Sequence, residues 1–124
     1  MVLAPDAPTT SLVLDTVSDR YARAGSTVVD APFDAVSGID GAPGTAVVAA
    51  ELGIVECILD DDADPADLGE GIGRLVADGW DVTVLVPAYR IGAAHAALRR
   101  HPALIQPWWL EDGEHVRFGA LEVP

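Results

Sequence analysis

The densest group of potentially reactive side chains in this sequence is an acidic run that follows an apolar segment. Asp60, Asp62 and Asp64 alternate along DDDADP, a spacing that also opens the calcium-binding loop of an EF-hand. That loop needs glycine at its sixth position and glutamate at its twelfth, where this sequence has Pro65 and Gly71. The sequence therefore excludes an EF-hand and favours a helix start, with Asp64 as N-cap and Pro65 as the first helical residue. A cation held by the three carboxylates stays open, because close like charges repel unless they are neutralised.

A second candidate site is the segment VPAYRIG, where a strand-like run is followed by a helix-like one. The end of a central parallel strand, next to a helix N-terminus, is a favoured ligand position in α/β proteins. Tyr89 and Arg90 could bind an anion there. The alternative, which the nearby acidic run favours, is that Arg90 pairs with the aspartates at the end of the neighbouring strand.

Two adjacent tryptophans, Trp108 and Trp109, are the third candidate. Neighbouring residues on a strand point to opposite faces of the sheet, so one indole can close the core while the other is exposed. An exposed tryptophan beside a hairpin is typical of a contact surface. We therefore expect a protein partner or a second copy of the chain to bind at this hairpin, and burial of both indoles is the alternative.

The histidines and the single cysteine form no catalytic pattern. His95, His101 and His115 lack the spacing of a metal site, and Cys57 lies inside an apolar segment with no helix N-terminus to lower its pKa. A single cysteine also excludes an internal disulfide and every multi-cysteine zinc motif. The absence of lysine excludes Schiff-base chemistry and the lysine-containing phosphate-binding loop.

The charge of the chain limits its partners. Twenty acidic residues are balanced by only seven arginines, which leaves a formal net charge of −13 on 124 residues. Such a charge disfavours direct nucleic-acid binding, which depends on cationic side chains. Two explanations stay open: adaptation to a salty cytoplasm or a high-GC genome, and acidic mimicry of a nucleic acid. Because the acids are scattered over expected helix faces and turns, the adaptation, halophilic or high-GC, is favoured.

Hydrophobic periodicity predicts one domain, residues 1–124, of alternating helices and strands. Helices are expected over three amphipathic segments: 11–24, 65–78 and 90–100. Strands are expected over the β-branched segments 26–33, 45–52, 54–60 and 81–87, with only Gly53 between the second and the third. A C-terminal hairpin extension is expected in 106–124, with Asp112-Gly113 at its turn. Residues 1–10 are expected to be loosely ordered and residues 34–44 to form a turn-rich loop.

This order predicts an α/β fold: a mixed sheet of four to six strands with helices packed on its faces. The helical crossover between segments 54–60 and 81–87 requires parallel pairing, whereas the short earlier connections favour antiparallel pairing. A flavodoxin-like or Rossmann-like sheet is the alternative, although the glycines of GEGIG lie within an expected helix. No apolar stretch approaches the roughly 20 residues of a membrane span. Without a secretory signal at the N-terminus, a cytoplasmic location is expected.

The element order over residues 11–105, with the phrase LVADGWDVTVLVPAYRIGAAHAALR, resembles the restriction-endonuclease-like PD-(D/E)XK nuclease superfamily. The resemblance implies an aspartate on the second strand and an Asp/Glu-x-Lys motif on the third, which bind Mg²⁺ and position water. Glu56 and Asp60 are similar to the third-strand acids, and Asp40 stands for the second-strand aspartate. The motif's lysine is missing, so the resemblance is to a degenerate, non-cleaving member.

The sequence therefore predicts a non-catalytic protein that acts through protein–protein contacts and needs no cofactor. A metal-dependent nuclease or hydrolase that uses Asp40, Glu56 and Asp60 with Mg²⁺ is the second hypothesis. The acidic nucleic-acid mimic is the third. Convergence of the three carboxylates would favour the nuclease, and their separation would contradict it.

Overall fold

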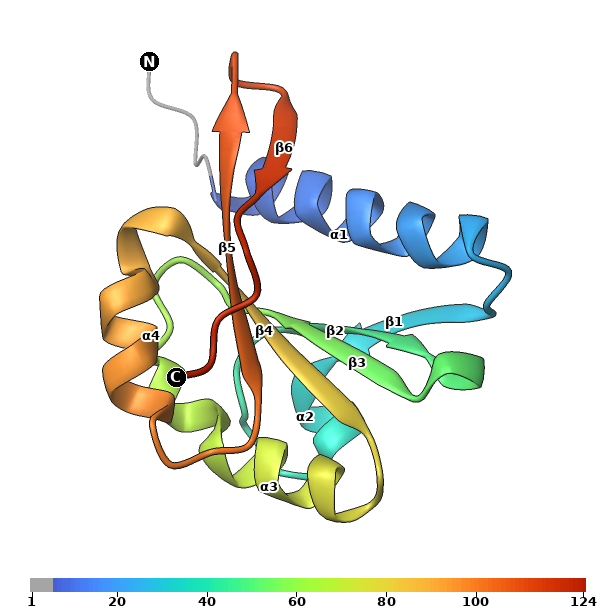
Figure 1. Cartoon of the computed structure of the whole chain (residues 1–124), viewed down its shortest axis with the longest axis vertical. Helices are drawn as coiled ribbons and strands as arrows, with labels where there is room; N and C mark the ends of the chain where they lie inside the picture. The colour runs from blue at the N-terminus through green and yellow to red at the C-terminus, as the bar shows by residue number, and fades with distance from the viewer. Residues whose placement is uncertain (1–5) are drawn as a thin grey trace.

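A six-stranded mixed sheet is the centre of the computed structural model, which describes residues 6–124 (Figure 1). The strands are β1 (Val28–Pro32), β2 (Thr45–Ala49), β3 (Ile54–Ile58), β4 (Asp81–Pro87), β5 (Leu104–Glu111) and β6 (His115–Phe118). The helices are α1 (Asp6–Arg23), α2 (Phe33–Ser37), α3 (Gly69–Ala77) and α4 (Ile91–Leu98). Short 3-10 turns precede or join them: η1 (Ala50–Leu52), η2 (Pro65–Leu68) and η3 (Ala88–Arg90). The expected α/β class and mixed sheet are confirmed.

The strands lie in the sheet in chain order, from β1 to β6. The first three pair antiparallel, as their short connections require. Strands β3, β4 and β5 are parallel, since a helical segment returns the chain each time, and β6 pairs antiparallel with β5. Doubly wound flavodoxin-like and Rossmann-like sheets reverse their strand order at a switch point. The order seen in residues 6–124 has no such reversal, so it does not match that alternative.

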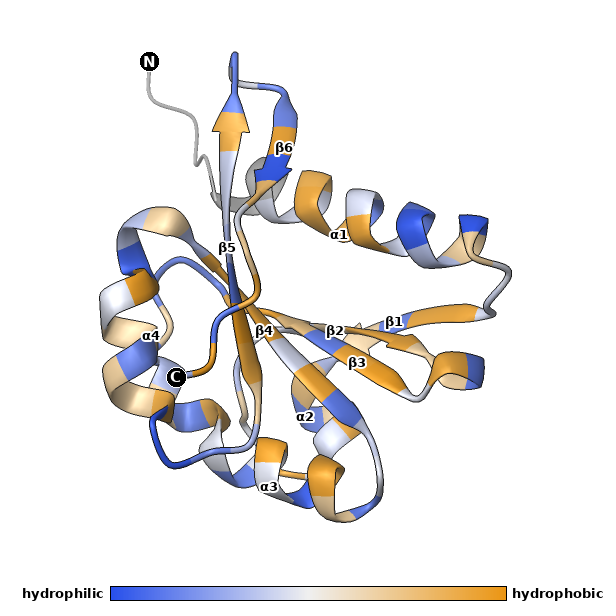
Figure 2. Cartoon of the chain, viewed as in Figure 1, coloured by the Kyte–Doolittle hydropathy of each residue, from blue (hydrophilic) through white to orange (hydrophobic). Residues whose placement is uncertain are grey.

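Side chains that alternate along the central strands enter two different cores. Val55 and Cys57 of β3, with Val84 of β4, join a large apolar cluster with residues of α2, α3 and α4. Ile58 and Leu85 join a smaller cluster against α1. Helix α1 therefore covers one face of the sheet, whereas three helices cover the other, and hydrophobic strand segments lie between them (Figure 2).

Two helical segments differ from the sequence prediction. Helix α1 begins at Asp6 rather than at residue 11, so residues 6–10, expected to be loosely ordered, are helical. Pro8 is compatible with this start, because N–H groups of the first turn have no intrahelical partner. Helix α2 takes the last residue of the expected strand 26–33 and the start of the expected loop 34–44, and its first residue, Phe33, is fully buried in the large cluster. The burial of Phe33 thus stabilises helix α2 although the neighbouring residues favour turns. Residues 1–5 are outside the described range.

The connections of the two hairpins are local features that the sequence indicates well. Gly53, between β2 and β3, has a φ of 68°, although the one-turn helix η1 adds to the expected single-glycine link. Asp112 and Gly113 have φ values of 55° and 73° at the turn of the C-terminal hairpin. Strand β5 of that hairpin also pairs parallel with β4, so the hairpin continues the sheet. Among the described residues, no helix is long and apolar enough to cross a membrane.

Candidate functional site

The structure separates the three carboxylates that the nuclease hypothesis brings together. Asp40 lies in the loop after α2, Glu56 in the middle of β3, and Asp60 just beyond the end of β3. Each lines a different surface hollow. Within residues 6–124, no group of three His, Cys, Asp or Glu side chains is placed to hold a metal ion. That statement includes the run Asp60, Asp62 and Asp64.

The acidic run begins a helix, as its spacing indicates. The Asp64 side chain accepts a hydrogen bond of 3.0 Å from the Ala66 N–H, and Pro65 is the first residue of η2. This N-cap satisfies a backbone donor that the helix itself cannot satisfy. Asp62 and Asp64 are exposed. The run therefore has a structural role at the start of η2 and α3.

Arg90 and Tyr89 hold the loop that follows β3. The Arg90 Nη1 atom donates hydrogen bonds to the backbone oxygens of Asp60 and Asp61, at 3.2 and 2.9 Å, and the Tyr89 hydroxyl donates to the Asp61 carboxylate. Arg90 thus meets the acidic segment, as expected, but through carbonyl groups rather than carboxylates. Carbonyls at a strand end lack ladder partners, which explains why a guanidinium binds there.

The two tryptophans divide as expected for neighbours on a strand. Trp108 is 8% exposed and packs in the cluster beneath α1, whereas Trp109 is 43% exposed. Cys57 is fully buried, and burial raises the pKa of its thiol, with the charge of Asp60 adding to the effect. His95 hydrogen-bonds Glu122 at 2.7 Å. Cys57 therefore packs in the core, and His95 holds the C-terminal tail through Glu122.

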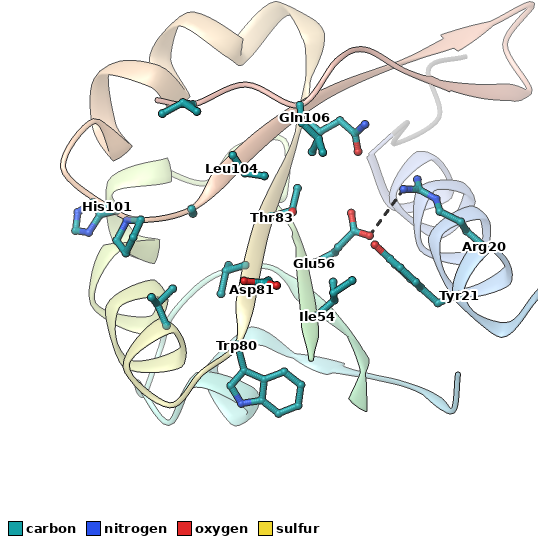
Figure 3. Close-up of a pocket in the computed structure, with 16 residues that line it drawn as sticks. Arg20, Tyr21, Ile54, Glu56, Trp80, Asp81, Thr83, His101, Leu104 and Gln106 are labelled. Carbon is teal, nitrogen blue, oxygen red and sulfur yellow. Dashed lines mark ion pairs between the residues drawn. The ribbon is translucent and has the colours of Figure 1, made fainter. Parts of the chain in front are cut away.

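A hollow of about 630 Å³ lies on the α1 side of the sheet. Its floor is a row of register partners, Glu56 on β3, Thr83 on β4 and Leu104 on β5. Arg20 and Tyr21, near the end of α1, form one wall (Figure 3). Helix α1 packs over β1, β2, β3 and β6, so it leaves this part of the sheet open.

The C-terminal tail forms the opposite wall. Ile105 of β5 forms an antiparallel bridge with Glu122, which places the tail alongside β5. Leu121 and Val123, on either side of Glu122, line the hollow, and Trp80 lines its end. The walls thus come from three segments that are distant in sequence.

Glu56 is the most unusual residue of the hollow. It is 1% exposed, and its Oε2 atom has no hydrogen-bond partner among the described residues. Burial raises the pKa of the carboxyl above its ordinary value, because the charged form loses its water. The Tyr21 hydroxyl and the Arg20 guanidinium oppose this rise by stabilising the carboxylate.

Arg20 is the nearest cation to this carboxylate. Its Nη1 atom is 3.9 Å from Glu56 Oε2, which is an ion-pair distance but too long for a hydrogen bond. The Arg20 guanidinium also lies 4.6 Å from the centre of the Phe118 ring, and its side chain is 40% exposed. Burial, followed by the neighbouring Glu56, raises the pKa of the Tyr21 hydroxyl, so Tyr21 keeps its proton beside this carboxyl group.

Sequence reasoning selects Glu56 but not its surroundings. Glu56 is the only charged residue in the apolar segment IVECIL, and that signal is visible without a structure. Arg20, Tyr21 and Gln106 carry no such signal, because α1 and β5 line the same hollow as Glu56 only in the folded chain. The site is therefore a buried carboxyl group in a hollow of mixed polar and apolar lining, and no metal-binding group of three such side chains is present within residues 6–124.

Comparisons with protein-family models, curated proteins and solved structures found no match for this chain. The degenerate PD-(D/E)XK resemblance therefore stays a prediction, as do halophilic adaptation and mimicry of nucleic acid.

Proposed function

We propose that this protein is non-catalytic and acts by binding, with the hollow beside Glu56 as the site for a small organic molecule. One observation carries the proposal: Glu56 Oε2 is buried on the floor of the hollow and accepts no hydrogen bond within residues 6–124. Leaving a buried acceptor unsatisfied disfavours folding by roughly 1–3 kcal/mol, and by more for a charged group. A ligand that donates hydrogen bonds would remove this penalty.

The size and lining of the hollow support a small ligand. Its volume of about 630 Å³ lies within the usual range of small-molecule sites. Ile54, Leu104 and Leu121 offer apolar surface, while Thr83, the register partner of Glu56, and Gln106 on β5 offer polar groups. Such a mixture provides affinity through burial of apolar area and orientation through a few polar contacts. The separation of Asp40 and Asp60 from Glu56 supports binding rather than metal-assisted hydrolysis.

The proposal can be tested by NMR titration of the labelled protein with small amines, alcohols and carboxylic acids. Binding in the hollow is expected to shift the amide signals of Thr83 and Leu104. The variant Leu104→Trp, which fills the floor, is expected to abolish these shifts. Val29→Trp is the matched control, because Val29 is an exposed strand residue that does not line the hollow. Equal shifts in both variants, or none in the wild type, would contradict the proposal.

A second candidate function is the protein–protein contact expected at the C-terminal hairpin. It is favoured by the 43% exposure of the Trp109 side chain on β5, next to the edge strand β6. Exposed tryptophans are enriched at contact surfaces because they bury a large area with little loss of side-chain freedom. Sedimentation velocity over a range of concentrations tests self-association. Trp109→Ser should weaken any dimer, whereas Leu12→Ser, at another exposed apolar residue, should not.

A further inference from the structure

We propose that the ligand of the hollow is an organic cation: an amine or guanidine whose N–H groups bind Glu56 and whose apolar body covers Leu104 and Leu121. This inference rests on the proposed function and narrows it to one class of ligand. The contacts of Glu56, the exposure of Arg20 and the charge of the whole chain support it.

Glu56 has a counter-charge but incomplete hydrogen bonding. An ionised carboxylate can accept about four hydrogen bonds. Oε2 accepts none from residues 6–124, and the Arg20 guanidinium stays 3.9 Å away. A cationic N–H donor would provide charge and hydrogen bonds together, and such charge-assisted bonds are about twice as strong as neutral ones.

Arg20 is the neighbouring side chain that would move aside for a ligand. Glu56 is almost completely covered, so a ligand reaches its carboxylate only where a neighbouring side chain yields. The Arg20 side chain is 40% exposed and forms part of that cover. Its guanidinium already contacts the Phe118 ring at 4.6 Å, and this cation–π contact can remain when a ligand takes its place at Glu56. Figure 3 shows Arg20 on the α1 side of the hollow, with its guanidinium directed to Glu56.

The charge of the chain favours a cationic ligand over an anionic one. A net charge of −13 makes the potential around the protein negative, which concentrates cations and repels anions. Asp81, an exposed residue that lines the hollow, adds a local negative charge beside the apolar floor. Apolar anions would have to approach against this field, whereas apolar amines approach with it.

The experiment compares three probes of similar size: 2-phenylethylamine, 2-phenylethanol and 3-phenylpropionate. Each is titrated into the labelled full chain at neutral pH, and amide shifts of Thr83 and Leu104 report binding in the hollow. The amine is expected to bind about tenfold more tightly than the alcohol, with the anion weakest.

Two glutamine variants make the test specific. Glu56→Gln is expected to weaken binding of the amine about tenfold and leave the alcohol unchanged. Glu51→Gln removes the same charge at an exposed residue outside the hollow, so the amine's affinity should change less than about twofold. Thermal unfolding of each variant is the control that it is folded.

Three results would overturn the inference. If both variants weaken the amine equally, the attraction comes from the net charge alone and not from Glu56. If the alcohol or the anion binds in the hollow as tightly as the amine, the cation preference is wrong while the proposed function stands. If no probe shifts the signals at concentrations of about 10 mM, the inference and the proposed function fail together.

Discussion

The two faces of the sheet share the same strands, but their packing differs. Towards α2, α3 and α4, the buried side chains form one large apolar cluster. Towards α1, the apolar cluster is smaller, and the row Glu56–Thr83–Leu104 lies beside it as the floor of an open hollow. Helices α2, α3 and α4 complete one face of the sheet, which we call the covered face. Helix α1 leaves part of the other face uncovered, and we call this the open face.

Strand β3 shows what this difference teaches. Val55 and Cys57 are fully buried on the covered face, and Glu56 between them is equally buried on the α1 face. The apolar pair is stabilised by its surroundings, but burial disfavours the charge of Glu56. Equal burial therefore has opposite energetic consequences on the two faces. The following predictions test that contrast, from the largest expected effect to the smallest.

Close packing on the covered face predicts a large effect of a single methyl group. An added Cβ at Gly71 in α3 would lie 2.7 Å from Phe33 Cε2 and 2.9 Å from Ser37 Cβ. We expect Gly71→Ala to lower the free energy of unfolding by about 2 kcal/mol, measured by urea denaturation. Gly73→Ala is the control in the same helix, because nothing lies within 4 Å of that Cβ. Here the better helix propensity of alanine should stabilise by about 1 kcal/mol, and a loss similar to that of Gly71→Ala would contradict close packing as the cause.

On the open face, Glu56→Gln is expected to stabilise the protein by roughly 1–2 kcal/mol at neutral pH. The folded state raises the pKa of this carboxyl above 4.5, so folded protein holds the proton more tightly than the unfolded chain. The penalty for ionisation is absent below pH 4.5 and grows as pH rises through the folded pKa. The difference between variant and wild type should therefore vanish in acid. Urea denaturation as a function of pH provides the measurement.

Glu51→Gln is the control of opposite sign. Hydrogen bonds from Thr27 and Ser26 lower the pKa of Glu51 to about 2. Its contribution is present above the ordinary pKa of 4.5 and is lost as pH falls towards 2. This variant should be less stable than the wild type at neutral pH and equal to it near pH 2. Parallel pH profiles of the two glutamine variants would show that their environments do not differ as described.

A smaller effect on stability is expected at the N-cap of η2, which leads into α3 on the covered face. Asp64→Ala removes the hydrogen bond to the Ala66 N–H and should lower the free energy of unfolding by about 1 kcal/mol. Asp64→Ser retains a capping oxygen and should recover most of this loss. If alanine and serine behave alike, the acidic run acts through its charge rather than through the cap.

The smallest effect is expected at the rim of the hollow. Leu121 is 54% exposed, so Leu121→Ser should change the free energy of unfolding by less than about 0.5 kcal/mol. Leu98→Ser on the covered face replaces a fully buried side chain and should destabilise by several times more. Equal losses measured by thermal unfolding would mean that the tail packs as core and the hollow is closed.

Local signals predicted much of the fold. The apolar run of residues 81–87 is the central strand β4, and the pair Asp112-Gly113 is the hairpin turn. Asp64-Pro65 marks the helix start at the expected residue. Each depends on backbone preferences or capping within a few residues, which is why sequence alone indicates them. Helix α2 was beyond such reasoning, since the burial of Phe33 outweighs its turn-forming neighbours.

For the site, the sequence by itself determined that one glutamate, Glu56, lies in an apolar strand. Because side chains alternate along a strand, it also determined that Glu56 points to the other face of the sheet from Val55 and Cys57. It also determined the strongly negative charge and the absence of lysine. Only the tertiary structure decided that Arg20 and Tyr21 approach Glu56, that Asp40 and Asp60 do not, and that a hollow remains beside it. The physical reason is that burial and hydrogen-bond partners come from the packing of segments distant in sequence. Local sequence patterns do not reveal which of these segments meet.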